Sequence, residues 1–321
     1  MIVETTLIKA QAPTSLAMGY FDGVHRGHTA VIADAVKAAK KLGLIPAVFT
    51  LQQSPRTVLL GEESHNINTN SEKLRLLEAL GVELVYNIDF RAVRNISADS
   101  FLKDIVIDKF CARYLSCGFN FHFGMGARGS GEMLEDMCKS YNISVCARPR
   151  INSLGSPVSS TRIRGCISEG KIREANEMLG RYYGIALPVV HGKKLGRTIG
   201  IPTLNQVFPQ GLVIPRFGAY ASIVTVDEKK YCGVTDIGIK PTVGSDKIQI
   251  ETWMPDYSGK ELYGMTIDIR LVDFLREEKK FPSLEELRSE IFKNAEQAKE
   301  IFKATPHRDC ASDFEHNFLS D

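Results

Sequence analysis

Residues 19–28 read GYFDGVHRGH and lie where a predicted strand, 14–21 (TSLAMGYF), turns into a predicted helix, 29–41 (TAVIADAVKAAKK). Glycines let the backbone approach a ligand closely, and a helix start presents unpaired amides and the positive end of its dipole. His25 and His28 add side-chain donors at the same place. This stretch therefore predicts an α/β domain with a polyphosphate pocket at the strand-to-helix turn.

The sequence from 14 to about 150 continues this alternation of short apolar runs and amphipathic stretches. Thr69 and Glu72 have the spacing of a capping box, which opens a predicted helix that Gly81 would end. LIPAVFTL, VELVYNI and ARYLSCGF read as further strands. Strands that alternate with helices predict β-α-β units around an open parallel sheet.

In the second half of the chain the apolar residues recur with a period of two, in GAYASIVTV, KKYCGVTDI, KIQIETW and LYGMTIDIRLVDF. This alternation predicts a small antiparallel barrel or sandwich. A capping box at Ser283 and Glu286 predicts a final helix against it. We therefore expect two domains, 1–184 and 185–305, followed by a flexible tail, 306–321.

The composition is that of a soluble globular protein: 321 residues, 44% of them hydrophobic and 24% charged. Forty Lys and Arg against 38 Asp and Glu give a net charge of +2, so we expect neither nucleic acid nor a membrane as a partner. The seven cysteines form no CxxC pair, and no segment resembles a signal peptide or a membrane helix. We expect a cytoplasmic monomer or weak homo-oligomer.

The pair of histidines in HxGH indicates nucleotidylyl transfer. Attack on an α-phosphate places extra negative charge on its oxygens, and preorganised donors stabilise that charge without any covalent nucleophile. One histidine alone at a helix start would more simply be a cap or core residue. The motif leaves the acceptor open, since adenylylation of nicotinate mononucleotide or phosphopantetheine and cytidylyl transfer to alcohol phosphates also fit.

Two further segments of the first half suit a nucleotide site. VSSTRIR, 158–164, places hydroxyls at a predicted helix start with two arginines behind, which suits a triphosphate or, equally, a simple helix cap. GFNFHFGMGARGSG, 118–131, is too rich in glycine for a helix and predicts a shaped loop whose aromatic residues could cover a flat ring. Asn120 and Arg128 are its expected polar contacts, and His122 is expected to be packed or at the surface.

The second half carries its own candidate site in HGKKLGRTIGIPTLN, 191–205. Thr203 and Asn205 project to one face of an extended segment, and their oxygens are hard ligands suited to Mg²⁺ bound to ATP. Glu251, in KIQIETW, could accept the proton of an attacking hydroxyl. A turn in a barrel and a solvated glutamate are the plainer interpretations of these two segments.

Taken in order from about 14 to 303, these motifs resemble the bacterial bifunctional riboflavin kinase and FMN adenylyltransferase family, the prokaryotic FAD synthetases. GAY at 218–220, GIKPT at 238–242, ETWMPDYSGKELYG and FLREEKKF add to the resemblance. It implies a Rossmann-like nucleotidyltransferase domain followed by a riboflavin kinase β-barrel with a C-terminal helix. It also implies riboflavin, FMN and FAD as substrates or products, ATP as co-substrate, and Mg²⁺.

The resemblance assigns roles to particular residues. His25 and His28 would stabilise the transferring AMP, Glu251 would be the general base for riboflavin, and Thr203 with Asn205 would hold Mg²⁺. Further nucleotide or flavin contacts in the first domain would be Gly19, Phe21, Asp22, Gly23, Asn120, Arg128, Ser160, Thr161, Arg162 and Arg164. In the kinase domain they would be Gly196, Arg197, Gly200, Pro202, Thr203, Asn205 and Arg276.

The sequence departs from the family at three places. LQQSPR, 51–56, replaces a Phe-x-Pro-His-Pro stretch, Trp253 replaces a usual His, and Asn294 replaces a frequent Asp. Two alternatives therefore stand beside the bifunctional enzyme. One is a riboflavin kinase whose adenylyltransferase domain is impaired, and the other is a non-catalytic flavin-binding protein.

Overall fold

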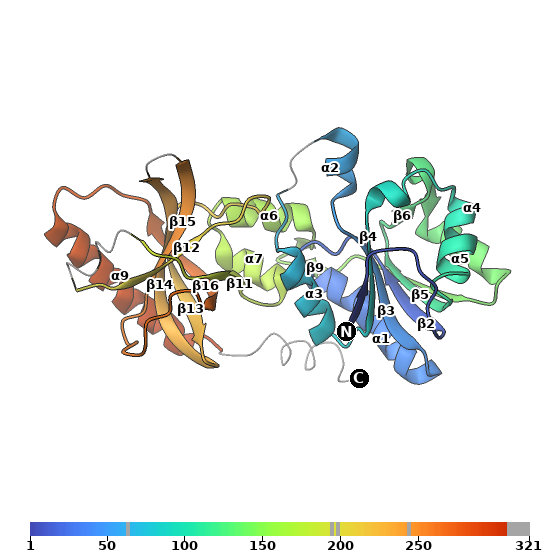
Figure 1. The fold of residues 1–321 in the computed structure, drawn as a ribbon, viewed down its shortest axis with the longest axis horizontal. Helices are drawn as coiled ribbons and strands as arrows, with labels where there is room; N and C mark the ends of the chain where they lie inside the picture. Colours follow the sequence, from blue (N-terminus) through green and yellow to red (C-terminus); the bar gives the residue numbers. More distant parts are fainter. Residues whose placement is uncertain (62–64, 193–195, 197–199, 243–244, 307–321) are drawn as a thin grey trace. The chain divides into compact units, whose positions relative to one another are not determined.

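The computed structural model describes residues 1–61, 65–192, 196, 200–242 and 245–306. The chain divides into two compact units, one spanning Met1–Ser160 and the other beginning at Thr161 (Figure 1). The expected flexible tail, apart from Pro306, lies outside the described residues.

The first unit is built on a six-stranded sheet in the order β1-β4-β3-β2-β5-β8, in which every neighbouring pair is parallel. This confirms the Rossmann-like sheet expected from the alternating pattern. Short apolar strands followed by helices can pair in parallel because each helix carries the chain back to the starting edge. The strands are β1 Ile2–Glu4, β2 Thr14–Met18, β3 Ile45–Leu51, β4 Leu84–Ile88, β5 Ala112–Gly118 and β8 Ser144–Arg148.

Helices cover both faces of this sheet, so its strands are almost continuously apolar. Helices α1 and α3 bury their apolar faces against one side, where Ile32 and Leu76 are fully buried. The segment 98–107 and helix α5 bury theirs against the other side. The helices are α1 Arg26–Leu42, α2 Pro55–Leu60, α3 Asn70–Ala79, η1 Phe90–Ala92, α4 Ala98–Ser100, η2 Phe101–Ile107 and α5 Gly131–Lys139.

Strand β2 lies at the centre of the sheet, between β3 and β5. The chain leaves β2 toward β3 on one side and returns to β5 on the other, so the two connections separate at its carboxyl end. Such a switch point leaves an open crevice, and ligands of parallel α/β sheets bind there. The GYFDGVHRGH motif begins at this end, one residue beyond Met18.

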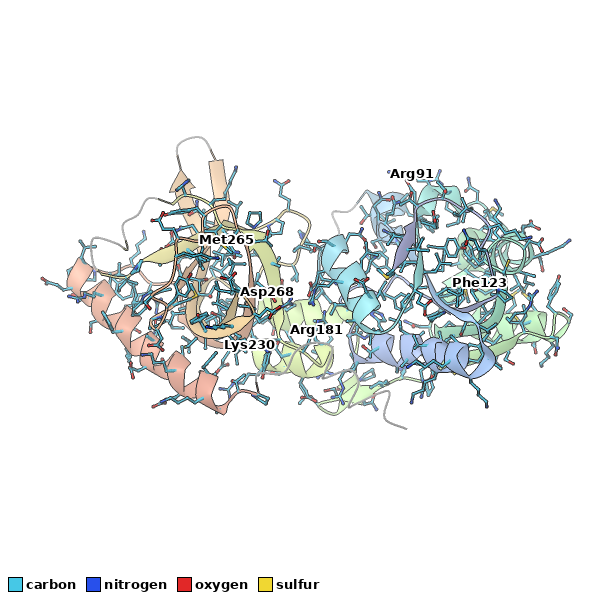
Figure 2. All side chains as sticks on the ribbon, turned by 60° about the horizontal axis from the view of Figure 1, so that its bottom comes forward. Arg91, Phe123, Arg181, Lys230, Met265 and Asp268 are labelled. Atoms are coloured by element: carbon cyan, nitrogen blue, oxygen red, sulfur yellow. The ribbon has the colours of Figure 1, made fainter. Side chains whose placement is uncertain are left out.

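The predicted loop 118–131 follows β5 and contains a two-stranded ribbon, β6 His122–Phe123 with β7 Gly129–Ser130, around η3 Met125–Ala127. Phe123 is buried, and its ring lies 5.6 Å from that of Phe101 and 5.9 Å from that of Phe121 (Figure 2). These aromatic contacts hold the base of the loop against the core of the first unit. A second short ribbon, β9 Asn152–Ser153 with β10 Ser156–Pro157, follows β8.

The second unit is a six-stranded antiparallel sheet in the order β11-β16-β13-β14-β15-β12. The sheet curls so that its edge strands meet, because Val190 beyond β11 donates its N–H to the carbonyl of Asn205 on β12, at 2.8 Å. The sequence left open whether this unit is a barrel or a sandwich, and the structure shows a curled antiparallel half-barrel. The strands are β11 Tyr183–Pro188, β12 Thr203–Val207, β13 Gly218–Val226, β14 Lys229–Thr242, β15 Ser245–Trp253 and β16 Thr266–Glu277.

Among the described residues, the helices of this unit include α6 Ser160–Ser168, which begins at the last residue of the first unit, α7 Ile172–Leu179 and α9 Leu284–Ala304. The predicted cap of α9 is confirmed, since Ser283 accepts the N–H of Glu286 at 3.2 Å. Helix α6 runs through Gly165. The side chain of Asn176 on α7 joins two barrel strands, by accepting the Tyr183 N–H and donating to the Leu271 carbonyl. The boundary of the catalytic domains near Gly184 stays a prediction.

Gly184 lies on β11, where an added Cβ would overlap the carbonyl oxygen of Ile269 on the paired strand. We expect Gly184→Ala to lower the free energy of unfolding of the second unit by about 2 kcal/mol, because neither backbone can move aside without strain. Ala186 is exposed on the same strand, so Ala186→Ser is the matched control and should change stability by less than about 0.5 kcal/mol. Equal denaturation midpoints for both variants would contradict this packing argument.

Candidate active sites

His25 is the N-cap of α1, with extended backbone angles of φ −75° and ψ 172°. Its Nδ1 accepts the backbone N–H of His28 at 3.3 Å, and the two rings stack with their centroids 3.6 Å apart. Because Nδ1 is the acceptor, the ring proton lies on Nε2, which remains a donor. His25 is therefore the N-cap of α1, and its role in adenylyl transfer stays a prediction.

Two glycines of the motif are required by its shape. A Cβ on Gly27 would lie 3.1 Å from Cε1 of His25, so the glycine leaves room for that ring to lie over the helix start. Gly23 has φ +81°, and a Cβ there would lie 2.7 Å from Cδ1 of Ile67. Phe21 and Val24 also have positive φ, at 55° and 40°, so the loop is a tight turn of unusual conformation.

A segment that sequence reasoning missed, Asn66–Asn68, anchors this loop. The side chain of Asp22 accepts the N–H of Ile67 at 2.9 Å, and Asn68 accepts the N–H of Gly23 at 2.9 Å. Asp22, Ile67 and Asn68 are all buried. The carboxylate of Asp22 therefore has a structural role in holding the turn, whatever it contributes to a ligand.

Ser160, the second serine of the VSSTRIR motif, contacts the GYFDGVHRGH motif. The hydroxyl of Ser160 donates to the carbonyl of Asp22 at 2.9 Å, which brings the start of α6 to the loop at the carboxyl end of β2. Thr161, Arg162 and Arg164 follow on α6 in the second unit, where Arg164 donates to the hydroxyl of Thr161 at 3.3 Å.

Asn120 and Arg128 lie in the loop after β5, the strand next to β2. Both side chains are exposed, and within the described part of the chain no hydrogen bond joins either of them to residues 19–28. His122 is exposed too, with Nδ1 bonded to the carbonyl of Asn120 at 2.9 Å, and this confirms it as a surface histidine.

The departure at 51–56 has an ordered local structure. Gln52 donates its side-chain amide to the carbonyl of Asn87 at 3.0 Å. Pro55 then begins α2, at the helix position where its missing N–H costs nothing. The segment therefore leads from β3 directly into a short helix.

In the second unit, strand pairing brings the kinase candidates together. Asn205 on β12 lies directly opposite Glu251 on β15, and Thr203 lies opposite Trp253. Residues that face each other across an antiparallel pair share one side of the sheet. The structure thus assigns Glu251 to the face of Thr203 and Asn205, which alternation alone left undecided.

The glycine-rich segment before β12 supports this face. Asn205 donates its Nδ2 to the carbonyl of Thr203 at 3.3 Å, so its Oδ1 is the end available to a ligand. Gly192 packs so closely that a Cβ would lie 2.5 Å from that Oδ1, and Gly196 accepts the N–H of Ile201 at 2.8 Å. Gly200 and Pro202 are exposed next to β12. Arg197 lies outside the described residues.

Asp236 lies directly opposite Glu251 on β14, the strand that pairs with the other edge of β15. Sequence reasoning did not single out Asp236. Arg276 on β16 is held by α9, where it donates to Oδ1 of Asn294 at 2.9 Å. Trp253 packs edge-on against Phe292 of the same helix, with ring centroids 5.3 Å apart. The departures at 253 and 294 therefore join the barrel face to α9.

The first unit thus has a parallel α/β architecture, and the second is a curled antiparallel half-barrel. Residues 7–162 match the family model for FAD synthetase, and residues 179–302 match the one for riboflavin kinase. The chain belongs to the family of bifunctional riboflavin kinase/FMN adenylyltransferases.

Individual relatives agree with this assignment. The chain is 32% identical over 302 residues to the bifunctional riboflavin kinase/FMN adenylyltransferase of Escherichia coli (strain K12), which covers 92% of this chain and 96% of that protein. The relative of the same name from Bacillus subtilis (strain 168) is 32% identical over 298 residues, covering 91% and 93%.

A solved structure also matches, the crystal structure of a macrolide-efflux protein from Streptococcus pneumoniae. Its TM-score is 0.83 at 29% identity, over 93% of this chain and 98% of that chain. That name differs from the name shared by the two relatives above. In the described part of the present chain, no helix is long and apolar enough to cross a membrane.

The capping role of His25 can be separated from its imidazole chemistry. We expect His25→Ala to lower the free energy of unfolding of the first unit by about 1 kcal/mol, because α1 loses its side-chain cap. Asparagine is a strong N-cap, so His25→Asn should unfold close to wild type in thermal or denaturant melts. If His25→Asn is as unstable as His25→Ala, the imidazole itself is needed for the fold.

Proposed function

We propose that this chain makes FAD from riboflavin in two ATP-dependent steps, each at a separate site. The enzyme is a riboflavin kinase and an FMN adenylyltransferase, with riboflavin, FMN and ATP as its substrates. The two reactions are assigned to two sites because the candidate residues lie in different units. The HxGH loop lies in the first unit, and the face with Thr203, Asn205 and Glu251 lies in the second.

Adenylyl transfer is assigned to the loop at the carboxyl end of β2. A phosphate oxygen of FMN attacks the α-phosphorus of ATP, the bond from that phosphorus to the bridging oxygen breaks, and pyrophosphate leaves. Nε2–H of His25 and the stacked His28 would donate to the oxygens that gain charge, together with the amides at the start of α1. Direct transfer needs no nucleophile from the protein.

Phosphoryl transfer is assigned to the face shared by β12 and β15. The terminal hydroxyl of the ribityl chain attacks the γ-phosphorus of ATP, Glu251 accepts its proton, and ADP leaves. Glu251 is partly buried, and it lies next to Asn205 through the strand register. A carboxylate so placed can accept a proton beside the bound nucleotide.

Thr203 and Asn205 fit a magnesium ion. Both offer neutral hard oxygens from one face of the sheet, and Nδ2 of Asn205 donates to the Thr203 carbonyl. Bound there with ATP, the ion would offset the charge of the phosphate oxygens. The two residues would hold it in place.

The remaining candidates have supporting roles in this proposal. Ser160 reaches the HxGH loop, and Thr161, Arg162 and Arg164 follow it to bind ATP phosphates. Asn120 and Arg128 contact the substrates from the loop after β5, with Gly19, Phe21, Asp22 and Gly23 shaping the pocket wall. In the kinase site, we expect Gly196, Gly200 and Pro202 to contact the nucleotide and Arg276 to orient the flavin, while Arg197 lies outside the described residues.

We propose that the enzyme works in the cytoplasm as a monomer or weak homo-oligomer. The described cysteines are free thiols, which suits a reducing compartment. Burial raises the pKa of Cys117 to about 12 and that of Cys138 to about 11, so these thiols stay protonated and unreactive at neutral pH.

The function is tested by chromatography of flavins after the purified protein is incubated with riboflavin, ATP and Mg²⁺, and then with FMN in place of riboflavin. We expect FAD in both incubations, and no FMN from riboflavin when EDTA removes the metal. FMN from riboflavin, with no FAD in either incubation, would mean that the altered segment 51–56 marks a kinase alone. Flavin binding without any turnover would make the chain a carrier.

The separation of sites predicts reciprocal losses in two variants. Glu251→Gln removes the proton acceptor, so FMN formation should fall by about 100-fold or more while adenylylation of supplied FMN continues. His25→Asn keeps the helix cap but removes the imidazole donor, so FAD formation from FMN should fall by about 100-fold while FMN formation continues. Loss of both activities in either folded variant would refute two independent sites.

A further inference from the structure

Lys73 is a charged residue on the buried face of α3, where its neighbours one turn on are Leu76 and Leu77. Its side chain is only 5% exposed. Lysine is almost never fully buried unless its ammonium group is paired or bonded, because leaving water is costly. The ammonium group of Lys73 therefore needs groups to bond to in this buried position.

The ammonium group of Lys73 bonds to the end of β3. Its Nζ donates to the carbonyl of Leu51 at 3.0 Å and to Oγ1 of Thr50 at 3.4 Å. That hydroxyl in turn donates to the carbonyl of Tyr20 at 2.9 Å. The chain of contacts therefore runs from α3 through the end of β3 into the loop after β2.

The same ammonium group also lies over the ring of Tyr20, 5.2 Å from its centroid, which is a favourable cation–π position. The hydroxyl of Tyr20 donates to the side chain of Asn66 at 2.9 Å. The backbone carbonyl of Tyr20 is thus held by Thr50 of β3, and its side chain is held by Asn66 in the segment that leads into α3. Tyr20 lies five residues before His25, in the loop that carries the histidines.

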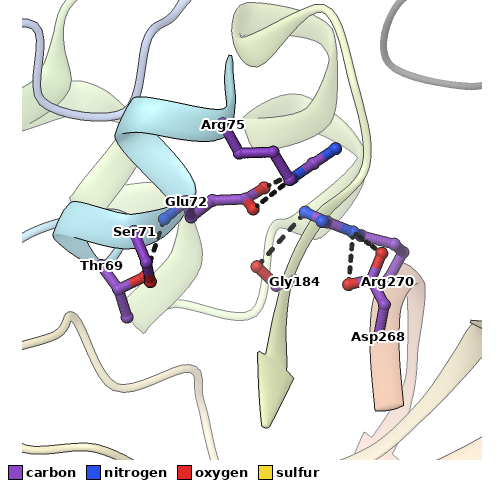
Figure 3. A network of polar contacts seen from close by, with 7 residues as sticks. All are labelled: Thr69, Ser71, Glu72, Arg75, Gly184, Asp268 and Arg270. Atoms are coloured by element: carbon purple, nitrogen blue, oxygen red, sulfur yellow. Dashed lines mark hydrogen bonds and ion pairs between the residues drawn. The ribbon is translucent and has the colours of Figure 1, made fainter. Parts of the chain in front are cut away.

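The start of α3 is itself firmly held. Thr69 accepts the N–H of Glu72 at 3.1 Å, and the carboxylate of Glu72 binds Arg75 at 2.9 and 3.0 Å (Figure 3). A capped and paired helix start gives Lys73 a fixed base from which to reach the two strand ends.

We propose that Lys73 is a positioning residue for adenylyl transfer, which ties α3 to the ends of β2 and β3 and so fixes the loop that presents His25 and His28. The inference rests on the proposed function of that loop. Lys73 acts through Tyr20, Thr50 and Leu51 and touches no reacting atom. It also donates to the carbonyl of Leu51, the first residue of the segment 51–56.

The ammonium group is open to titration. Burial lowers the pKa of Lys73 from 10.5 to about 8, and the carboxylate of Asp22 opposes this fall. On α3 its charged neighbours, Glu72 and Arg75, pair with each other, while Tyr20 and Thr50 face it as neutral groups. Above pH 8 the amine loses its charge and one donor, so the contacts that position the loop weaken as the pH rises.

The test compares Lys73→Met and Lys73→Arg with the wild-type enzyme. Methionine keeps the apolar stem without the charge, and we expect kcat for FAD formation from FMN to fall by about 100-fold, the cost of a loop misplaced by about 1 Å. FMN formation from riboflavin should be unchanged. Lys41→Met, at an exposed position on α1, is the matched control and should leave both activities unchanged.

The pH profile distinguishes positioning from simple loss of stability. In the wild type, kcat for FAD formation should fall as the pH rises through about 8. Arginine does not titrate in this range, so Lys73→Arg should restore most of the activity and lose that alkaline limb. The inference is overturned if Lys73→Met makes FAD at the wild-type rate, or if Lys73→Arg keeps the limb. A wild-type enzyme that makes no FAD refutes the proposed function instead.

Discussion

The pairing of β2 with β3 on one side and β5 on the other is the constraint on which the first site depends. All three strands are parallel, so their carboxyl ends meet at one edge, and the connections to β3 and β5 diverge there. The loop after β2 occupies the resulting crevice and starts α1 with His25 as its cap. In the proposed site, the start of α1 and the stacked rings of His25 and His28 lie together at the end of this strand.

The second site depends on register instead of on a crevice. Antiparallel pairing of β12 with β15 sets Asn205 opposite Glu251, and pairing of β15 with β14 adds Asp236 to the same row. A slip of one residue would turn Glu251 to the other side of the sheet. The closing bond between Val190 and Asn205 holds β12 at the edge and so helps to keep this register.

Local signals predicted much of the fold, and they also indicated the residues that are proposed for the two sites. The side-chain helix caps at Thr69 and Ser283 are present as expected, because each joins residues only three apart. Contacts between distant segments were not predicted. Asp22 and Ile67 are 45 residues apart, and nothing in either stretch identifies the other as its partner. Lys73 could have been noticed, since its helical spacing from Leu76 and Leu77 places it on the buried face.

The sequence by itself determined that the first half is α/β and that the second half is built on antiparallel strands. It also indicated the HxGH turn and the pair of hard oxygen ligands on Thr203 and Asn205. These are properties of short segments, set by periodicity, turn chemistry and side-chain type. Only the tertiary structure decided that Glu251 shares a face with Asn205, and that Lys73 supports the loop of the first site. The physical reason is that periodicity specifies which residues of one segment lie together, whereas register and partner depend on packing between segments far apart in the chain.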